Sequence, residues 1–229
     1  DSQGKIAEYI AECRSLGIRL LPPDINQSGP DFTVAGRDIR FGLAALKGVG
    51  RGFTNAVLAR RQADGPFTSF PDFCQRLIDN DMNRRVLESL IRAGAFDAMG
   101  VRRSQLLDAY EQLIDSLTRN RRKNLEGQFD LFSLGQEKPE PVELVLRDLP
   151  EFSQEELMTM EKEVTGLYLS GHPMDAYRDT VRAQGAVPIA SVLEDFAQEE
   201  GPTQFQDGQR ILLAGVVAAA KTKTTKNNS

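Results

Sequence analysis

The residues best suited to chemistry are the glycines of Lys47-Gly48-Val49-Gly50-Arg51, which lie between a short apolar run (39–46) and a helix-like segment (53–61). Glycine has no Cβ, so the backbone here can adopt positive φ and bring its N–H groups against a bulky anion. The N-terminus of the following helix adds free N–H donors and a partial positive charge. With a helix pattern on either side, the stretch predicts a phosphate site in a helix-hairpin-helix turn. A plain turn between helices is the alternative.

Charge is distributed unevenly along the chain. The net charge of −5 argues against a uniformly basic surface. Residues 37–61, however, hold one acid, Asp38, against six basic residues: Arg37, Arg40, Lys47, Arg51, Arg60 and Arg61. Residues 137–163 reverse the balance, with nine acids against three bases. We therefore expect a basic face around the glycine turn, where further phosphate contacts come from Lys47, Arg51, Arg84 and Arg85.

Helical spacing of apolar residues indicates the elements that position this turn. Phe32–Val34 and Asp38–Phe41 are predicted to pair as a short β-hairpin just before it. Helices are predicted over residues 4–16, 53–61, 71–78, from Asn83 onward, and over 104–118. A second turn, at Gly94, follows the first. One such unit buries too little apolar surface to be stable alone, so the prediction is a mainly α fold built on a tandem helix-hairpin-helix domain.

A linker is predicted over residues 124–150, which are rich in Glu and Pro and have no clear periodicity. Within it, Gln128-Phe129-Asp130-Leu131-Phe132 places three large apolar residues in a polar segment. One interpretation is that they attach the linker to its own domain. The other is that Gln128, Leu131 and Phe132 fill an apolar pocket on a partner, while the linker supplies reach.

The C-terminal part of the chain predicts a change of structure. Ser153-Gln154-Glu155-Glu156 is a capping box that opens a helix running to Val164, and residues 174–183 suggest another helix. His172, the only histidine, has no metal-ligand neighbours in the sequence and is predicted to form structural hydrogen bonds. Residues 209–217 are predicted to be a strand that opens a truncated β-domain.

Several function classes are disfavoured by composition. No apolar run approaches the roughly 20 residues that cross a membrane, and the N-terminus lacks a signal-peptide layout. Cys13 and Cys74 are far apart and are expected to be free thiols in a reducing compartment, although a disulfide stays open. We expect a cytoplasmic protein whose two ends are cut from a longer chain.

Five ordered stretches resemble one known family, the bacterial replicative DNA polymerases of the DNA polymerase III alpha type. They are Leu21-Pro22-Pro23-Asp24-Ile25-Asn26, Ile39–Gly50, Asn83–Glu88, Ala93-Gly94-Ala95-Phe96-Asp97 and Gly166–Pro173. The resemblance implies the end of a fingers domain (1–36), a tandem helix-hairpin-helix domain (37–123), a linker with a sliding-clamp motif (124–150), a helical connector (151–186) and the truncated start of an OB domain (187–229).

The resemblance also implies partners. In this family, residues near Lys47, Gly48, Val49, Gly50 and Arg51 contact the backbone of duplex DNA. The clamp motif maps onto Gln128, Leu131 and Phe132, so the sliding clamp (the beta subunit) and other replicase subunits are expected partners.

Catalysis is expected to lie elsewhere. The family uses three palm aspartates that hold Mg²⁺, and no stretch of this sequence matches them, so no catalytic residue, metal ligand or cofactor is assigned. Two alternatives stay open: a structural scaffold, in which the hairpins only turn the chain, and the helix-hairpin-helix region of a DNA repair enzyme.

Overall fold

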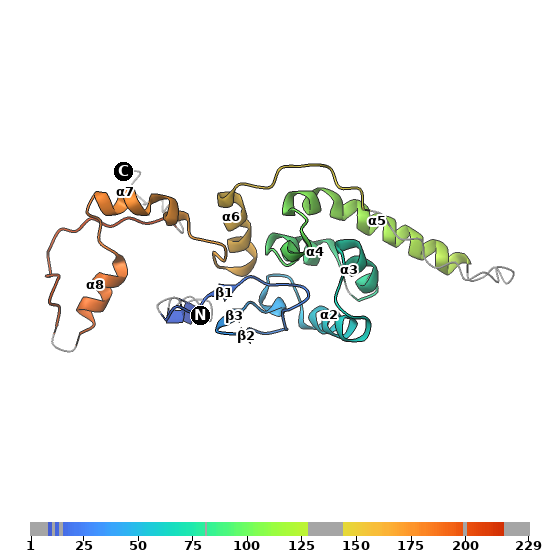
Figure 1. The fold of residues 1–229 in the computed structure, drawn as a ribbon, viewed down its shortest axis with the longest axis horizontal. Helices are drawn as coiled ribbons and strands as arrows, with labels where there is room; N and C mark the ends of the chain where they lie inside the picture. The colour runs from blue at the N-terminus through green and yellow to red at the C-terminus, as the bar shows by residue number, and fades with distance from the viewer. Residues whose placement is uncertain are drawn as a thin grey trace, which may run out of the picture. The chain divides into compact units, whose positions relative to one another are not determined.

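A computed structural model describes residues 9–10, 12–13, 16–80, 82–127, 144–198 and 201–217, with side chains from 122 to 127 left aside. The chain divides into two compact units, residues 1–170 and 171–229, and each is described by itself. The described part is mainly helical with one small sheet (Figure 1), which confirms the predicted fold class. The helix predicted over residues 4–16 lies largely outside the described residues.

A three-stranded sheet precedes the glycine turn. Its strands are β1 (Leu20–Leu21), β2 (Thr33–Ala35) and β3 (Asp38–Arg40), in the order β1-β3-β2. β2 and β3 form the predicted antiparallel hairpin, and β1 adds in parallel to β3. Asp38, the first residue of β3, holds the start of β1 beside it. Its buried carboxylate accepts hydrogen bonds from the backbone N–H and the guanidinium of Arg19, and these bonds lower the pKa of Asp38.

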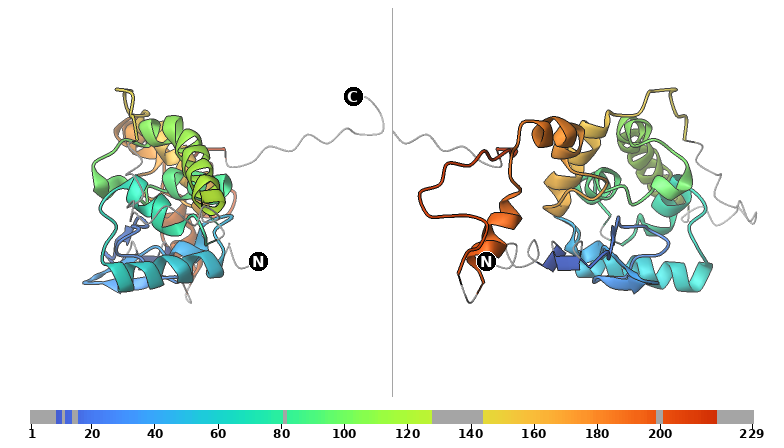
Figure 2. Two further views of the ribbon diagram at one scale, coloured as in Figure 1. Left: turned by 90° about the vertical axis from the view of Figure 1, so that its right-hand side faces the viewer. Right: turned by 60° about the vertical axis from the view of Figure 1, so that its left-hand side comes forward.

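Among the described residues, five α-helices follow the sheet in the first unit: α2 (Arg51–Asp64), α3 (Phe70–Leu77), α4 (Arg84–Arg92), α5 (Arg103–Gly127) and α6 (Gln154–Thr165). Three begin where the sequence predicts, because local side chains cap them: Ser69 accepts from Asp72 N–H, Asn83 from Val86 N–H, and Ser153 forms the capping box with Glu156. Both views of Figure 2 place α3 and α4 between α5 and the layer of α2 and the sheet.

Aromatic side chains connect these helices through the core. Phe73 of α3 makes edge-to-face contacts with Phe53 of α2, with Phe67, and with Phe96 beyond α4. Phe70 and Phe96 meet at right angles, with ring centroids 4.9 Å apart. Such pairs add about 0.5–1.5 kcal/mol beyond burial, so one continuous core holds both hairpins.

The Leu-Pro-Pro-Asp-Ile-Asn stretch forms a turn that connects two other segments of the first unit. Asp24 accepts from the N–H groups of Asn26 and Gln27, which sets a tight turn. The amide of Asn26 then donates to Phe67 O and accepts from Phe67 N–H. Ile25 N–H reaches Ala95 O at 2.9 Å, so this turn joins the α2–α3 loop to the second hairpin.

The second unit contains a 3₁₀ segment η3 (Pro173–Tyr177), α7 (Arg178–Ala183) and α8 (Ile189–Phe196). His172 has the predicted structural role, since its Nδ1 accepts from Met174 N–H at the start of η3. Asp195 organises the following loop: burial opposes its ionisation, but the N–H groups of residues 203–205 donate to it and keep its pKa below the ordinary value.

The strand predicted over residues 209–217 is not formed in the described part of the chain. Among the described residues, the only backbone hydrogen bond from this segment to a distant part of the chain runs from Val187 N–H to Leu212 O, at 2.8 Å. A strand needs a continuous ladder with a neighbour, and the described residues supply none here. The OB assignment therefore stays a prediction. Among the described helices, none is both long and apolar enough to span a bilayer.

Candidate nucleic-acid interface

The glycine turn joins β3 to α2 through one 3₁₀ turn, η1 (Leu43–Ala45). The helix pattern predicted before the turn is therefore wrong, whereas the helix after it is confirmed. The reason is the loop before β2: Leu43 N–H donates to Gly29 O and Ala44 N–H to Pro30 O. A Cβ on Gly42 would overlap the backbone of Pro30 and Asp31. The chain is thus tied to this loop and cannot extend as an α-helix.

Only one of the two hairpin glycines needs its conformational freedom. Gly48 has φ +82°, a left-handed conformation that other residues rarely adopt. Gly50 has φ −84° and precedes the first residue of α2. A Cβ on Gly50 would face open space, so this position is accessible to a ligand but imposes no backbone demand.

Unsatisfied N–H groups collect at this turn. The N–H groups of Gly48 and Gly50, and those of the first three residues of α2, have no acceptor among the described residues. No side chain caps α2. Val49 differs from its prediction as a donor: its side chain is buried in the core, and its N–H donates to Leu46 O at 3.1 Å. The turn and helix end therefore present N–H donors that an oxyanion would satisfy.

Two cations flank these donors. Lys47 and Arg85 are exposed, and neither makes an ion pair within the described part of the chain. Arg85 extends over Gly48, since its Nε lies 3.5 Å from where a Cβ on Gly48 would stand. The structure thus brings Lys47, Gly48, Gly50 and Arg85 together, as the sequence predicts.

Two other predicted contacts carry paired charges. Arg51 reaches Asp31, with Nη2 and Oδ1 2.5 Å apart. Arg84 lies on α4 but bonds to α5, where Asp115 Oδ1 is 2.8 Å away and Glu111 Oε2 is 3.7 Å away. The hydrogen bond to Asp115 raises the pKa of Arg84. Both side chains are half-exposed, so a phosphate would have to compete with carboxylates already in place.

The glycine of the second hairpin is buried. Gly94 has φ +80°, and residues 93–96 are all buried. Its amides are engaged, because Gly94 N–H donates to Ile91 O and Ala95 N–H to Leu90 O. The guanidinium of Arg103 lies directly over Gly94, where a Cβ would collide with it.

Arg103 is the centre of a buried polar cluster that sequence reasoning missed. It bonds to Asp97 Oδ2 at 2.6 Å, to Glu161 Oε1 at 3.2 Å, and to the carbonyl of Arg92 at the end of α4. Burial alone would lower the pKa of Arg103, but these hydrogen bonds and charges raise it above the ordinary value. Glu161, fully buried on α6, also accepts from Leu169 and Ser170 N–H. The cluster binds α4, α5 and α6 together.

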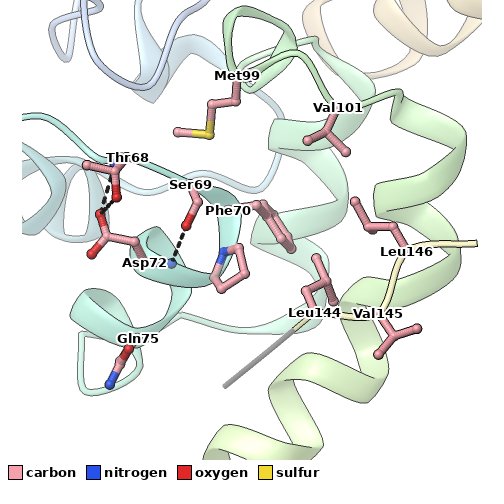
Figure 3. A pocket seen from close by; sticks show the side chains of 11 residues that line it. Thr68, Ser69, Phe70, Asp72, Gln75, Met99, Val101, Leu144, Val145 and Leu146 are labelled. Atoms are coloured by element: carbon pink, nitrogen blue, oxygen red, sulfur yellow. Dashed lines mark hydrogen bonds between the residues drawn. The ribbon is translucent and has the colours of Figure 1, made fainter. Parts of the chain in front are cut away.

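An open groove lies beside the start of α3 (Figure 3), with a volume of about 510 Å³. Residues 68–72 line one side and Leu144, Val145 and Leu146 the other. Its polar groups bond to each other, as where Thr68 donates to Asp72. The predicted clamp residues Gln128, Leu131 and Phe132 lie outside the described residues. No group of three or more metal-ligating side chains occurs within the described ranges.

Comparison with known proteins agrees with this geometry. Residues 17–106 match the family model of a helix-hairpin-helix motif. DNA polymerase III subunit alpha of Mycobacterium tuberculosis is 34% identical over 99% of this chain and 19% of its own length. The proteins of that name from Thermus aquaticus and Neisseria meningitidis are 37% and 39% identical, over 97% and 99% of this chain and 17% and 18% of their lengths. The chain thus spans about a fifth of the length of these relatives, and it is similar to a segment of proteins named DNA polymerase III subunit alpha.

Proposed function

We propose that this chain holds the backbone of DNA, without reading bases, as part of a replicative DNA-directed DNA polymerase. The observation that carries the proposal is the glycine turn, where free N–H groups and two unpaired cations converge on one surface. The match to a helix-hairpin-helix motif and the relatives named DNA polymerase III subunit alpha support it. The N–H groups at the uncapped end of α2 would donate to a phosphate oxygen, and Lys47 and Arg85 would add charge.

This chemistry implies positioning rather than catalysis. In the family the Mg²⁺ ions are expected at palm aspartates that no stretch of this sequence matches, so the proposal assigns this chain no catalytic residue. Binding through phosphates predicts low sequence preference and an affinity that falls steeply with salt.

The test is to replace Gly48 with alanine in the intact protein. Alanine at φ +82° is strained, so the turn should reorganise and turn the N–H groups of Gly48 and Gly50 away from the phosphate. We expect duplex affinity at low salt to fall about tenfold, or about 1.4 kcal/mol, in a fluorescence anisotropy titration. Gly65→Ala is the matched control, because Gly65 has φ +81° at the other end of α2 and a Cβ there would meet no atom within 4 Å. Equal affinity for the Gly48 variant and the control would refute the proposal.

A finer proposal concerns the sliding clamp. The apolar residues of Gln128–Phe132, set in a polar linker, suit a pocket on a partner. Replacing Gln128, Leu131 and Phe132 with alanine should abolish capture of the intact protein on immobilised clamp. Alanines at Glu137, Lys138 and Glu140 in the same linker should leave capture unchanged. Equal capture of both variants would favour the alternative that the motif packs on its own domain.

Two broader assignments are part of the same proposal. Work in a replicase implies other replicase subunits as partners and a cytoplasmic location. The repair-enzyme alternative has less support, because similarity to replicative subunits extends over 97–99% of this chain in the relatives compared. The scaffold alternative has one observation in its favour, the burial of residues 93–96 at the second hairpin.

A further inference from the structure

We infer that the two hairpins have divided their roles: the first alone contacts DNA, along one strand, and the second is an internal clasp that positions it. This inference rests on the proposed function and deepens it. A symmetrical tandem would instead use both turns as phosphate sites, one for each strand of the duplex.

The two turns differ in whether their backbone N–H groups are hydrogen bonded. At the first, the N–H groups of Gly48 and Gly50 lack acceptors among the described residues. At the second, Gly94, Ala95 and Asp97 donate to Ile91, Leu90 and Gly94 respectively. The amides of Gly94 and Ala95 are both paired and buried, so they give an anion nothing to bind. The glycine position of the second turn is therefore closed to phosphate.

The helix that follows each turn repeats this difference. No side chain caps α2. At α5, however, the carboxylate of Glu151 accepts from Arg103 N–H at 2.7 Å and from Ser104 N–H at 3.1 Å. A carboxylate of the chain itself thus occupies the place a phosphate would take.

The basic side chains beside the two turns differ in the same way, in whether they are paired with carboxylates. Lys47 and Arg85 have no ion-pair partner in the described ranges. Beside the second turn, Arg103 is buried and bonded to Asp97 and Glu161, and Arg102 is 2.8 Å from Asp148. The free positive charge therefore lies at the first hairpin, where the free N–H groups also lie. The free N–H groups belong to Gly48 and to residues 50–53, so they lie close enough along the chain to serve neighbouring phosphates of one strand.

The second hairpin has a different use, because it and its helices fix the first. Ser89 of α4 donates its hydroxyl to Lys47 O at 2.8 Å. Lys47 N–H donates to Val164 O at the end of α6, also at 2.8 Å. Since Glu161 and Arg103 join α6 to α5, the buried cluster fixes the position of α6, to which the backbone of Lys47 is hydrogen bonded. The clasp orients the free donors without touching DNA.

The experiment compares salt dependence in the intact protein carrying Lys47→Gln, Arg85→Gln, Arg102→Gln or Glu151→Ala. Binding to a duplex and to single-stranded DNA is measured by anisotropy over a salt series. Each lost phosphate contact should reduce the slope of log K against log salt by about 0.9 on duplex and about 0.7 on a single strand. We expect this reduction for Lys47→Gln and Arg85→Gln on both ligands, and an unchanged slope for Arg102→Gln and Glu151→Ala.

The outcomes separate the inference from the proposed function. If Arg102→Gln reduces the slope as Lys47→Gln does, or Glu151→Ala tightens binding, the second hairpin is a DNA site and the division of roles is wrong. If the Lys47 and Arg85 effects occur only on duplex, the contact is not to one strand. If no variant changes the slope, the proposed function itself fails.

Discussion

Replacing Glu161 with alanine is expected to destabilise the first unit by about 3–5 kcal/mol, the usual cost of removing one partner of a buried ion pair. Glu161 is fully buried, and the side chain of Arg103 is only 6% exposed. The substitution leaves a buried guanidinium with one carboxylate fewer. It also leaves the N–H groups of Leu169 and Ser170 without their acceptor.

Hydrogen exchange of α6 amides in the intact protein measures this loss locally, without assuming that the whole chain unfolds in one step. Glu163→Ala is the matched control, since Glu163 lies on the same helix and pairs with Arg92 but is 58% exposed. An exposed pair contributes about 0–1 kcal/mol, so the control should exchange almost as the native protein does. Equal protection in both variants would show that the buried pair does not hold α6.

The first hairpin should respond to the Glu161 variant as well. Val164 O, one turn further along α6, accepts from Lys47 N–H. If α6 becomes less ordered, the glycine turn bonded to it is oriented less precisely. DNA affinity is then expected to fall although no DNA contact has been removed. A variant with lost protection and unchanged affinity would separate the clasp from the hairpin.

Much of the fold was predictable because its signals are local. Ser69, Asn83 and Ser153 cap helices through bonds to residues three positions on, and periodic apolar residues define the buried face of each helix. The β2–β3 hairpin is local in the same sense. The two-residue strand β1 was missed, because it exists only through its pairing with β3.

The contacts that assemble these elements were not predictable from one sequence. Asn26 bonds to Phe67 across 41 positions, and Arg103 bonds to Glu161 across 58. Glu151 caps a helix that begins 48 positions before it. Each is an ordinary polar residue in its local sequence, and no spacing rule connects it to its partner.

The candidate site shows the same limit. Gly48 and Gly50 were identified by turn chemistry, which is local, whereas Lys47 was identified by its charge. Charge alone placed Arg51 and Arg84 at the site, and the structure pairs both with carboxylates from other segments. Sequence reveals a charge but not the neighbour that neutralises it, so Arg85 is the member of the Arg84–Arg85 pair left free to bind phosphate.

Replacing Gly94 with alanine is expected to cost more stability than the same change at Gly100, although both have positive φ, +80° and +74°. Left-handed backbone costs an alanine about 1–2 kcal/mol at either position. At Gly100 the added Cβ meets no atom within 4 Å, so strain is the whole effect. At Gly94 it collides with the Arg103 guanidinium and the Asp97 carboxylate, which are bonded to each other.

The Gly94 variant must therefore displace the buried cluster, and we expect a total loss of about 3–5 kcal/mol, like that of breaking the Arg103–Glu161 pair directly. Hydrogen exchange of α4 and α6 amides in the intact protein measures it, with Gly100→Ala as the strain-only reference. If both variants lose equal protection, the approach of Arg103 to Gly94 adds nothing beyond backbone strain. If the Gly94 variant loses more, this glycine is required because Arg103 occupies the space of its side chain. In that case Gly94 serves the buried cluster, whereas the role proposed for Gly48 is phosphate binding.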